Sequence, residues 1–127
     1  MHKSRLGQLN IDCQTNDLDR AAGFWSGALG VAVKPVTDEI DSNYRALSMP
    51  ADQVKIEVQK VGHPSRVHLD IETDDVEAEV KRLEKLGAKR IEQVRTWWVM
   101  EAPTGQRFCV VRVQRADFAE HANAWND

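Results

Sequence analysis

A strand-like run, a set of helix-starting residues and a helical pattern occur twice in this chain, in the same order. In the first copy, residues 9–14 alternate between apolar and polar, and the helical pattern that follows ends at Gly30. In the second copy, residues 67–72 alternate in the same way, and the helical pattern ends at Gly87. Repetition of both the pattern and its helix-starting residues predicts two similar modules in one chain.

Each copy is typical of a βαβββ unit. The polar residues 15–17 and 73–75 can accept hydrogen bonds from the free N–H groups of a first helical turn, so a helix is expected to begin after each. Apolar residues then recur at helical spacing: Leu18, Ala21, Ala22, Trp25 and Leu29 in the first copy, and Val76, Val80, Leu83 and Leu86 in the second. Three strand-like runs follow each helix, at residues 31–36, 44–49 and 54–59, and at residues 89–94, 97–101 and 107–113.

The remaining segments carry weaker patterns. Residues 1–7 form a polar, basic lead-in without periodicity, and residues 37–43 are expected to form a polar loop. The tail has Phe118, Ala122 and Trp125 at helical spacing, which predicts a short amphipathic helix. We therefore predict a single domain over residues 1–127, with module one at about 8–60, module two at about 66–113 and a C-terminal tail at 114–127.

Length and charge limit the classes of protein. A chain of 127 residues is long enough for one ordinary core and too short for two large independent domains. The net charge of −3 offers no basic surface for nucleic acid, and no apolar run has the length of a membrane span or the form of a secretory signal. We expect a cytoplasmic protein without nucleic-acid or membrane partners. Cys13 and Cys109 are expected to be reduced thiols, because disulfides are rare in the cytosol.

Three motifs give the chain a resemblance to a known superfamily. Residues 17–25 with the Leu-Gly pair after them, residues 68–75 with the second Leu-Gly pair, and residues 102–106 resemble motifs of the vicinal oxygen chelate superfamily. This superfamily includes glyoxalase I, extradiol dioxygenases and the bleomycin resistance proteins, and this chain is most similar to its small glyoxalase-like domains. The resemblance implies an α+β fold in which two paired βαβββ modules form a cupped mixed sheet. It also implies a small-molecule ligand in the cup and a homodimer.

The resemblance also identifies positions for a metal ion. Metal-using members take one ligand from each of four strands, and these positions fall on Asn10, Glu57, His68 and Cys109, with Asn10 aligned to His68 when the halves are overlaid. Only Glu57 and His68 are of the usual type, because Asn is a weak oxygen ligand and Cys is a soft one. No metal cofactor is therefore favoured. A divalent metal held by Glu57 and His68 is the alternative, and a set of Glu, His and Cys could hold zinc.

The polar faces of the expected strands supply the candidate ligand-binding residues. Alternation alone is better explained by the solvent face of an antiparallel sheet, whereas the resemblance directs these faces into the cup. The candidates are Asn10, Asp12, Lys55, Glu57, His68, Asp70, Trp97, Trp98 and Cys109. One of the two adjacent tryptophans is expected to face the cup and the other the helices. His68 and Glu57 are the candidate catalytic acid or base, and Glu72 is expected to add a carboxylate to the cup.

These observations lead to one functional prediction and two alternatives. The first is a metal-independent, small-molecule-binding protein of the glyoxalase-like or drug-sequestering kind. The first alternative is a metal-dependent isomerase, lyase or dioxygenase that acts on a substrate with vicinal oxygens. The second is a metal-free acid/base enzyme that uses His68 with Glu57.

Overall fold

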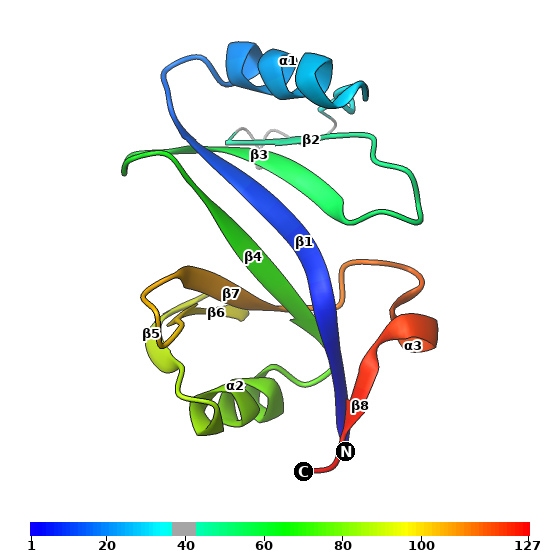
Figure 1. Cartoon of the computed structure of the whole chain (residues 1–127), viewed down its shortest axis with the longest axis vertical. Helices are drawn as coiled ribbons and strands as arrows, with labels where there is room; N and C mark the ends of the chain where they lie inside the picture. The colour runs from blue at the N-terminus through cyan, green and yellow to red at the C-terminus, as the bar shows by residue number, and fades with distance from the viewer. Residues whose placement is uncertain (37–42) are drawn as a thin grey trace. The chain divides into compact units, whose positions relative to one another are not determined.

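The computed structural model describes residues 1–36 and 43–127, which contain eight strands and three helices (Figure 1). The chain therefore has the α+β class predicted from its sequence. It divides into two compact units, one of residues Gln8–Val67 and the other of Met1–Gly7 with His68–Asp127. None of the helices in the described residues is long and apolar enough to cross a membrane.

The first unit is a three-stranded mixed sheet covered by one helix. It contains the second half of β1 (His2–Gln14), then α1 (Leu18–Leu29), β2 (Tyr44–Ala46) and β3 (Lys55–Val61). Strand β3 runs parallel to β1, and β2 runs antiparallel to β3. Buried apolar residues from the helix and the sheet form the core: Ile11, Leu18, Ala22, Leu47, Ile56 and Val58. The strand expected at residues 31–36 is reduced to one bridge between Val33 and Leu47.

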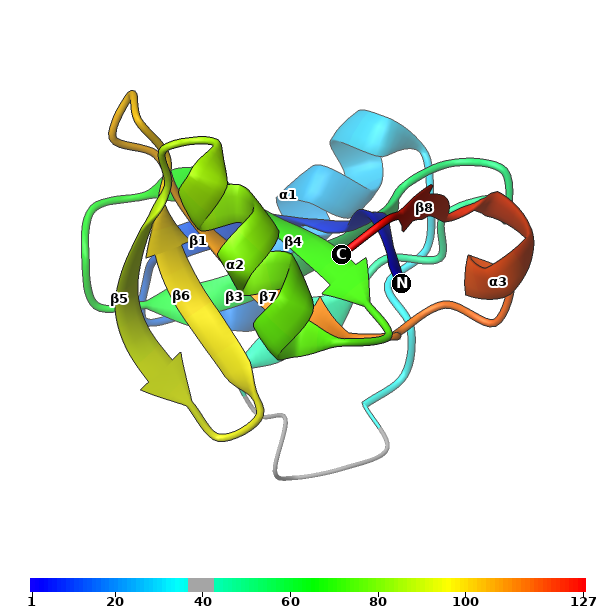
Figure 2. The same cartoon turned by 90° about the horizontal axis from the view of Figure 1, so that it is seen from below.

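The second unit repeats this arrangement with more strands. It contains β4 (Arg66–Thr73) from His68 onward, α2 (Val76–Lys85), β5 (Lys89–Val94), β6 (Trp97–Glu101) and β7 (Arg107–Arg112). Strand β4 pairs in parallel with β7, while β7 with β6 and β6 with β5 are antiparallel. Helix α2 packs against β5, β6 and β7 (Figure 2). The core of the second unit consists of Val80, Leu83, Met100 and Val110.

The internal repeat extends to individual hydrogen bonds at the two helix starts. Asp17 and Asp75 are the N-cap residues of α1 and α2, and the side chain of each accepts a backbone N–H of the first turn. The backbone N–H of Asp17 donates to Thr15 Oγ1 at 3.0 Å, and that of Asp75 donates to Thr73 Oγ1 at 3.1 Å. Gly30 ends α1 in the left-handed conformation, with φ of 71°. The helix boundaries predicted from the sequence are thus confirmed.

The two ends of the chain differ from the prediction. Residues 2–7 are part of β1 rather than an irregular lead-in, and the tail forms only a one-turn helix, α3 (Phe118–His121), before strand β8 (Asn123–Trp125). Strand β8 pairs antiparallel with the first residues of β1. Neither segment has an apolar pattern from which a strand can be predicted. Each is ordered instead by polar partners far away in sequence. The polar loop expected at residues 37–43 lies outside the described residues except for Asn43.

The apolar face of β4 is covered only in part. Ile71 packs against the core beside α2, as the alternation predicts. Val67 and Leu69 are 56% and 43% exposed, so alternation alone does not place this whole face in the core. The core beside α2 includes Ile71 and does not extend to Val67 or Leu69.

Candidate functional site

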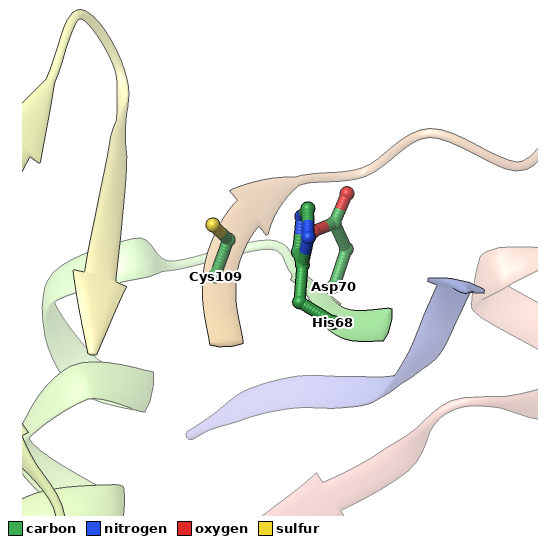
Figure 3. A group of neighbouring side chains, drawn as sticks. All are labelled: His68, Asp70 and Cys109. Atoms are coloured by element: carbon green, nitrogen blue, oxygen red, sulfur yellow. The ribbon is translucent and has the colours of Figure 1, made fainter. Parts of the chain in front are cut away.

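His68, Asp70 and Cys109 lie together on one face of the second unit (Figure 3). His68 and Asp70 are two residues apart on β4, so their side chains point to the same side. Cys109 is on β7, directly opposite Asp70 in the parallel pairing. One ligand atom from each residue lies within 4.8 Å of those of the other two, and His68 Nε2 is 3.5 Å from Asp70 Oδ1. We call these three residues the His68 cluster.

Local packing explains why these side chains share a face. Ile71 and Val110 pack in the core beside α2, so their chain neighbours Asp70 and Cys109 must point away from that helix. Val99 of β6 is directly opposite Cys109, which continues the same row of side chains across the sheet. The cluster is therefore carried by two paired strands that are backed by a packed core.

The cluster is shielded without being inaccessible. The side chains of His68 and Asp70 are each 14% exposed, and Cys109 is partly buried. An imidazole can donate or accept a hydrogen bond, a carboxylate can accept several, and a thiol can lose its proton to become a nucleophile or ligand. Such a set can bind a small polar molecule directly.

The same three residues can also hold a metal ion. They supply one nitrogen, one oxygen and one sulfur donor, a combination that zinc accepts. Three protein ligands leave a position open for a ligand or water, as in catalytic zinc sites. The donor set therefore fits a borderline divalent metal, and Asp70 is a candidate ligand that the overlay of the two halves did not identify.

The strand register explains why Asp70 was predicted as a ligand-binding residue but not as part of the metal set. In the first unit, Asn10 of β1 is opposite Glu57 of β3. The sequence overlay aligns His68 with Asn10, so His68 is the residue expected opposite Cys109 in the second unit. The residue opposite Cys109 is instead Asp70. A shift of two residues leaves the side chains on the same face but changes which one is opposite the partner strand. The available signal was the spacing of His68 and Asp70.

The two adjacent tryptophans separate as expected, one on each face of β6. Trp98 packs against the core beside α2, and the guanidinium of Arg90 lies over its ring at 5.1 Å. Trp98 therefore does not belong to the face that carries Cys109. Trp97, Val99 and Cys109 share that face by alternation and pairing, so Trp97 is the tryptophan available to a ligand there.

The other predicted site residues belong to the first unit. Asn10 is 2% exposed and accepts a hydrogen bond from Gln8 Nε2 at 2.6 Å. Lys55 and Glu57 are partly exposed on β3. Their contribution to a cup shared with His68 remains a prediction.

Asp12 is also buried in the first unit, beside two groups that the sequence analysis did not assign to the site. Asp12 Oδ2 is 3.8 Å from Arg66 Nε and 4.0 Å from His63 Nε2. Arg66, which begins β4, thus brings a positive charge close to one of the predicted cup carboxylates.

Glu72 is not available to a ligand, contrary to the prediction. It is completely buried and forms an ion pair with Arg5 Nε at 2.6 Å. Its other carboxylate oxygen accepts the backbone N–H groups of Gln114 and Arg115, at 2.7 and 3.0 Å. Alternation placed Glu72 with His68 and Asp70, but β1 and the segment after β7 cover this end of β4.

A separate hollow of about 520 Å³ lies in the first unit, at the ends of β1 and β3. Its lining is mostly polar and includes Gln14, Lys60 and Gly62. None of the predicted site residues lines it, so it gives no support to the predicted cup.

The fold and the cluster define the class of this protein: an α+β chain of two related units, each with a helix packed on a mixed sheet, and a strand face that presents nitrogen, oxygen and sulfur donors. The family model of the glyoxalase-like domain matches residues 8–111. The chain therefore belongs to the glyoxalase-like domain family, within the vicinal oxygen chelate superfamily that its motifs indicated. No curated protein matches it in sequence.

Solved structures show the same fold at low sequence identity. Methylmalonyl-CoA epimerase from Mycobacterium tuberculosis is 17% identical, with a TM-score of 0.63 over 90% of this chain and 91% of that one. A glyoxalase/bleomycin resistance protein/dioxygenase superfamily member from Vibrio splendidus 12B01 is 19% identical, with a TM-score of 0.51 over 84% and 98%. The 2,2',3-trihydroxybiphenyl 1,2-dioxygenase of Sphingomonas wittichii RW1 is 14% identical, with a TM-score of 0.58 over 88% of this chain and 42% of that one.

Proposed function

We propose that this chain is a small-molecule-binding glyoxalase-like protein whose ligand contacts the His68 cluster. The observation that supports this proposal is that His68, Asp70 and Cys109 have ligand atoms within 4.8 Å of one another on a shielded but accessible strand face. Trp97 on the same face could stack on a flat ligand. Small oxygen-bearing acids and diols are the first ligands to test, because one similar structure is an epimerase of a CoA thioester and another is a dioxygenase of a hydroxylated biphenyl.

Of the three modes predicted from the sequence, the donor set best supports the one that uses a metal. His68, Asp70 and Cys109 would hold the ion, and the metal would act as a Lewis acid toward oxygen atoms of the ligand. The residues of the chain supply the other requirements. The packed strands β4 and β7 hold all three donors close together on one face.

The metal-free mode has its own supporting observation. His68 Nε2 and Asp70 Oδ1 are 3.5 Å apart, so the imidazole and the carboxylate can present a donor and an acceptor to a ligand without an ion between them. In this mode the protein captures its ligand and performs no chemistry.

Equilibrium dialysis of the tag-free protein against zinc distinguishes the two modes. If the metal site exists, the wild type binds one equivalent of zinc. His68→Gln, Asp70→Asn and Cys109→Ser should each weaken zinc binding at least tenfold, because removing even a residue that only hydrogen-bonds to a metal ligand weakens metal binding by about that much. Cys13→Ser is the matched control, because Cys13 is the other free thiol and lies in the first unit. Equal binding by the wild type and Cys109→Ser would exclude this metal site and leave the metal-free mode.

We also propose that the protein is cytoplasmic and forms a homodimer. The mass in solution, measured by light scattering, tests the second proposal.

A further inference from the structure

His2 is buried between two carboxylates in the second unit. It is 2% exposed, and its Nε2 lies 2.8 Å from Glu79 Oε1 of α2. Its Nδ1 lies 2.5 Å from Asp127 Oδ1, two residues after β8. A neutral imidazole has only one N–H, whereas a carboxylate oxygen can only accept. Both contacts are therefore hydrogen bonds only when His2 is the doubly protonated imidazolium.

The same contacts hold the C-terminal residues against β1 and α2. We call residues 123–127, which comprise β8 and the two residues after it, the C-terminal strap. The strap pairs with residues 2–4 of β1, and Trp125 Nε1 donates a hydrogen bond to Ser4 Oγ at 2.8 Å. The guanidinium of Arg82 lies over the Trp125 ring at 4.0 Å. His2 and Arg82 both join the strap to the buried carboxylate of Glu79, and of these two only His2 contacts Asp127.

The charges around His2 come from three parts of the second unit. Glu79 is fully buried and also accepts two hydrogen bonds from Arg82, both at 2.8 Å. Asp127 has a side chain that is 38% exposed, and the α-ammonium of Met1 lies 3.2 Å from it. Burial alone would lower the pKa of His2, but the hydrogen bonds to Glu79 and Asp127 raise it above its usual value.

We propose that the C-terminal strap is a pH-controlled clasp, closed while His2 is doubly protonated and loosened at Asp127 when His2 loses a proton. On deprotonation the remaining N–H stays with Glu79, because that carboxylate has no access to solvent. The lone pair of Nδ1 then faces Asp127, which can turn into water. Because the folded pKa of His2 is raised, its contribution is complete below the unfolded pKa and is lost as pH rises through the folded value.

The indole N–H of Trp125 reports on the strap by NMR. The intrinsic exchange rate of an indole N–H depends on pH, and the Trp97 indole serves as the reference for this correction. After the correction, the protection of the Trp125 indole from solvent exchange should be constant at low pH. Above the pKa of His2 it should fall by up to about tenfold per pH unit, as one-proton linkage requires. Asp127→Asn keeps the fold but removes the charge facing Nδ1, so it should lower the pKa of His2 and weaken protection at low pH.

Two further variants complete the test. His2→Gln should remove the pH dependence, while His121→Gln should retain it, since His121 is 66% exposed and lies outside the strap. Protection that stays constant through the measured titration of His2, or that changes with pH in the same way in Asp127→Asn as in the wild type, would overturn the proposal.

Discussion

At the residue scale, Glu72 and Gly7 form a close structural contact in the second unit. The carboxylate of Glu72 is surrounded by Arg5 and the backbone N–H groups of Gln114 and Arg115. Gly7 lies against its side chain, and a Cβ atom at position 7 would come within 2.9 Å of Glu72 Cβ and Cγ. This carboxylate therefore has the role of a buried anchor that joins β1, β4 and the segment after β7.

We expect Glu72→Ala to reduce the free energy of unfolding by about 3 kcal/mol, because two N–H groups lose their buried acceptor and Arg5 keeps only Asp117 as an ion-pair partner. Urea denaturation followed by circular dichroism measures the loss. Glu120→Gln is the control, since Glu120 is exposed on α3. A Glu72→Ala variant as stable as the control would contradict the anchoring role.

Single residues also show what the sequence could not supply. His68, Asp70 and Glu72 alternate identically in the sequence, yet the first two are partly exposed and the third is completely buried. The difference comes from Arg5, whose ion pair with Glu72 joins residues 67 positions apart. A pattern within one strand carries no information about such a partner.

At the element scale, the two helices begin with the same local contacts and were predicted for that reason. Thr15 with Asp17, and Thr73 with Asp75, form hydrogen bonds within three residues, so the sequence contains both partners. Strands β1 and β8 are different. The residues of β8 pair with the start of β1 at the opposite end of the chain, so helical spacing in the tail was misleading.

We expect Asp75→Ala to lower stability by about 1 kcal/mol, because α2 loses the side-chain acceptor for its Ala78 N–H. Asp75→Asn keeps an acceptor at the same place and should cost less. Thermal and urea unfolding of both variants measure the difference. Equal losses for Ala and Asn would show that the charge of Asp75, rather than its capping hydrogen bond, stabilises the helix.

At the scale of the whole molecule, each unit has its own core, its own helix and a parallel pair of strands with polar residues in register. These pairs are Asn10 with Glu57 in the first unit and Asp70 with Cys109 in the second. The sequence predicted the family, the α+β class and the polar strand faces, because they depend on periodicity and short motifs. It did not identify Asp70 as the residue opposite Cys109, because that depends on the register between strands distant in sequence.

The central claim is that His68, Asp70 and Cys109 together form a metal site. X-ray absorption at the zinc edge of the zinc-loaded protein tests this most directly. We predict one sulfur scatterer at about 2.3 Å together with nitrogen and oxygen at about 2.0 Å, and loss of the sulfur in Cys109→Ser. A spectrum explained by nitrogen and oxygen alone, and unchanged in Cys109→Ser, would contradict the claim.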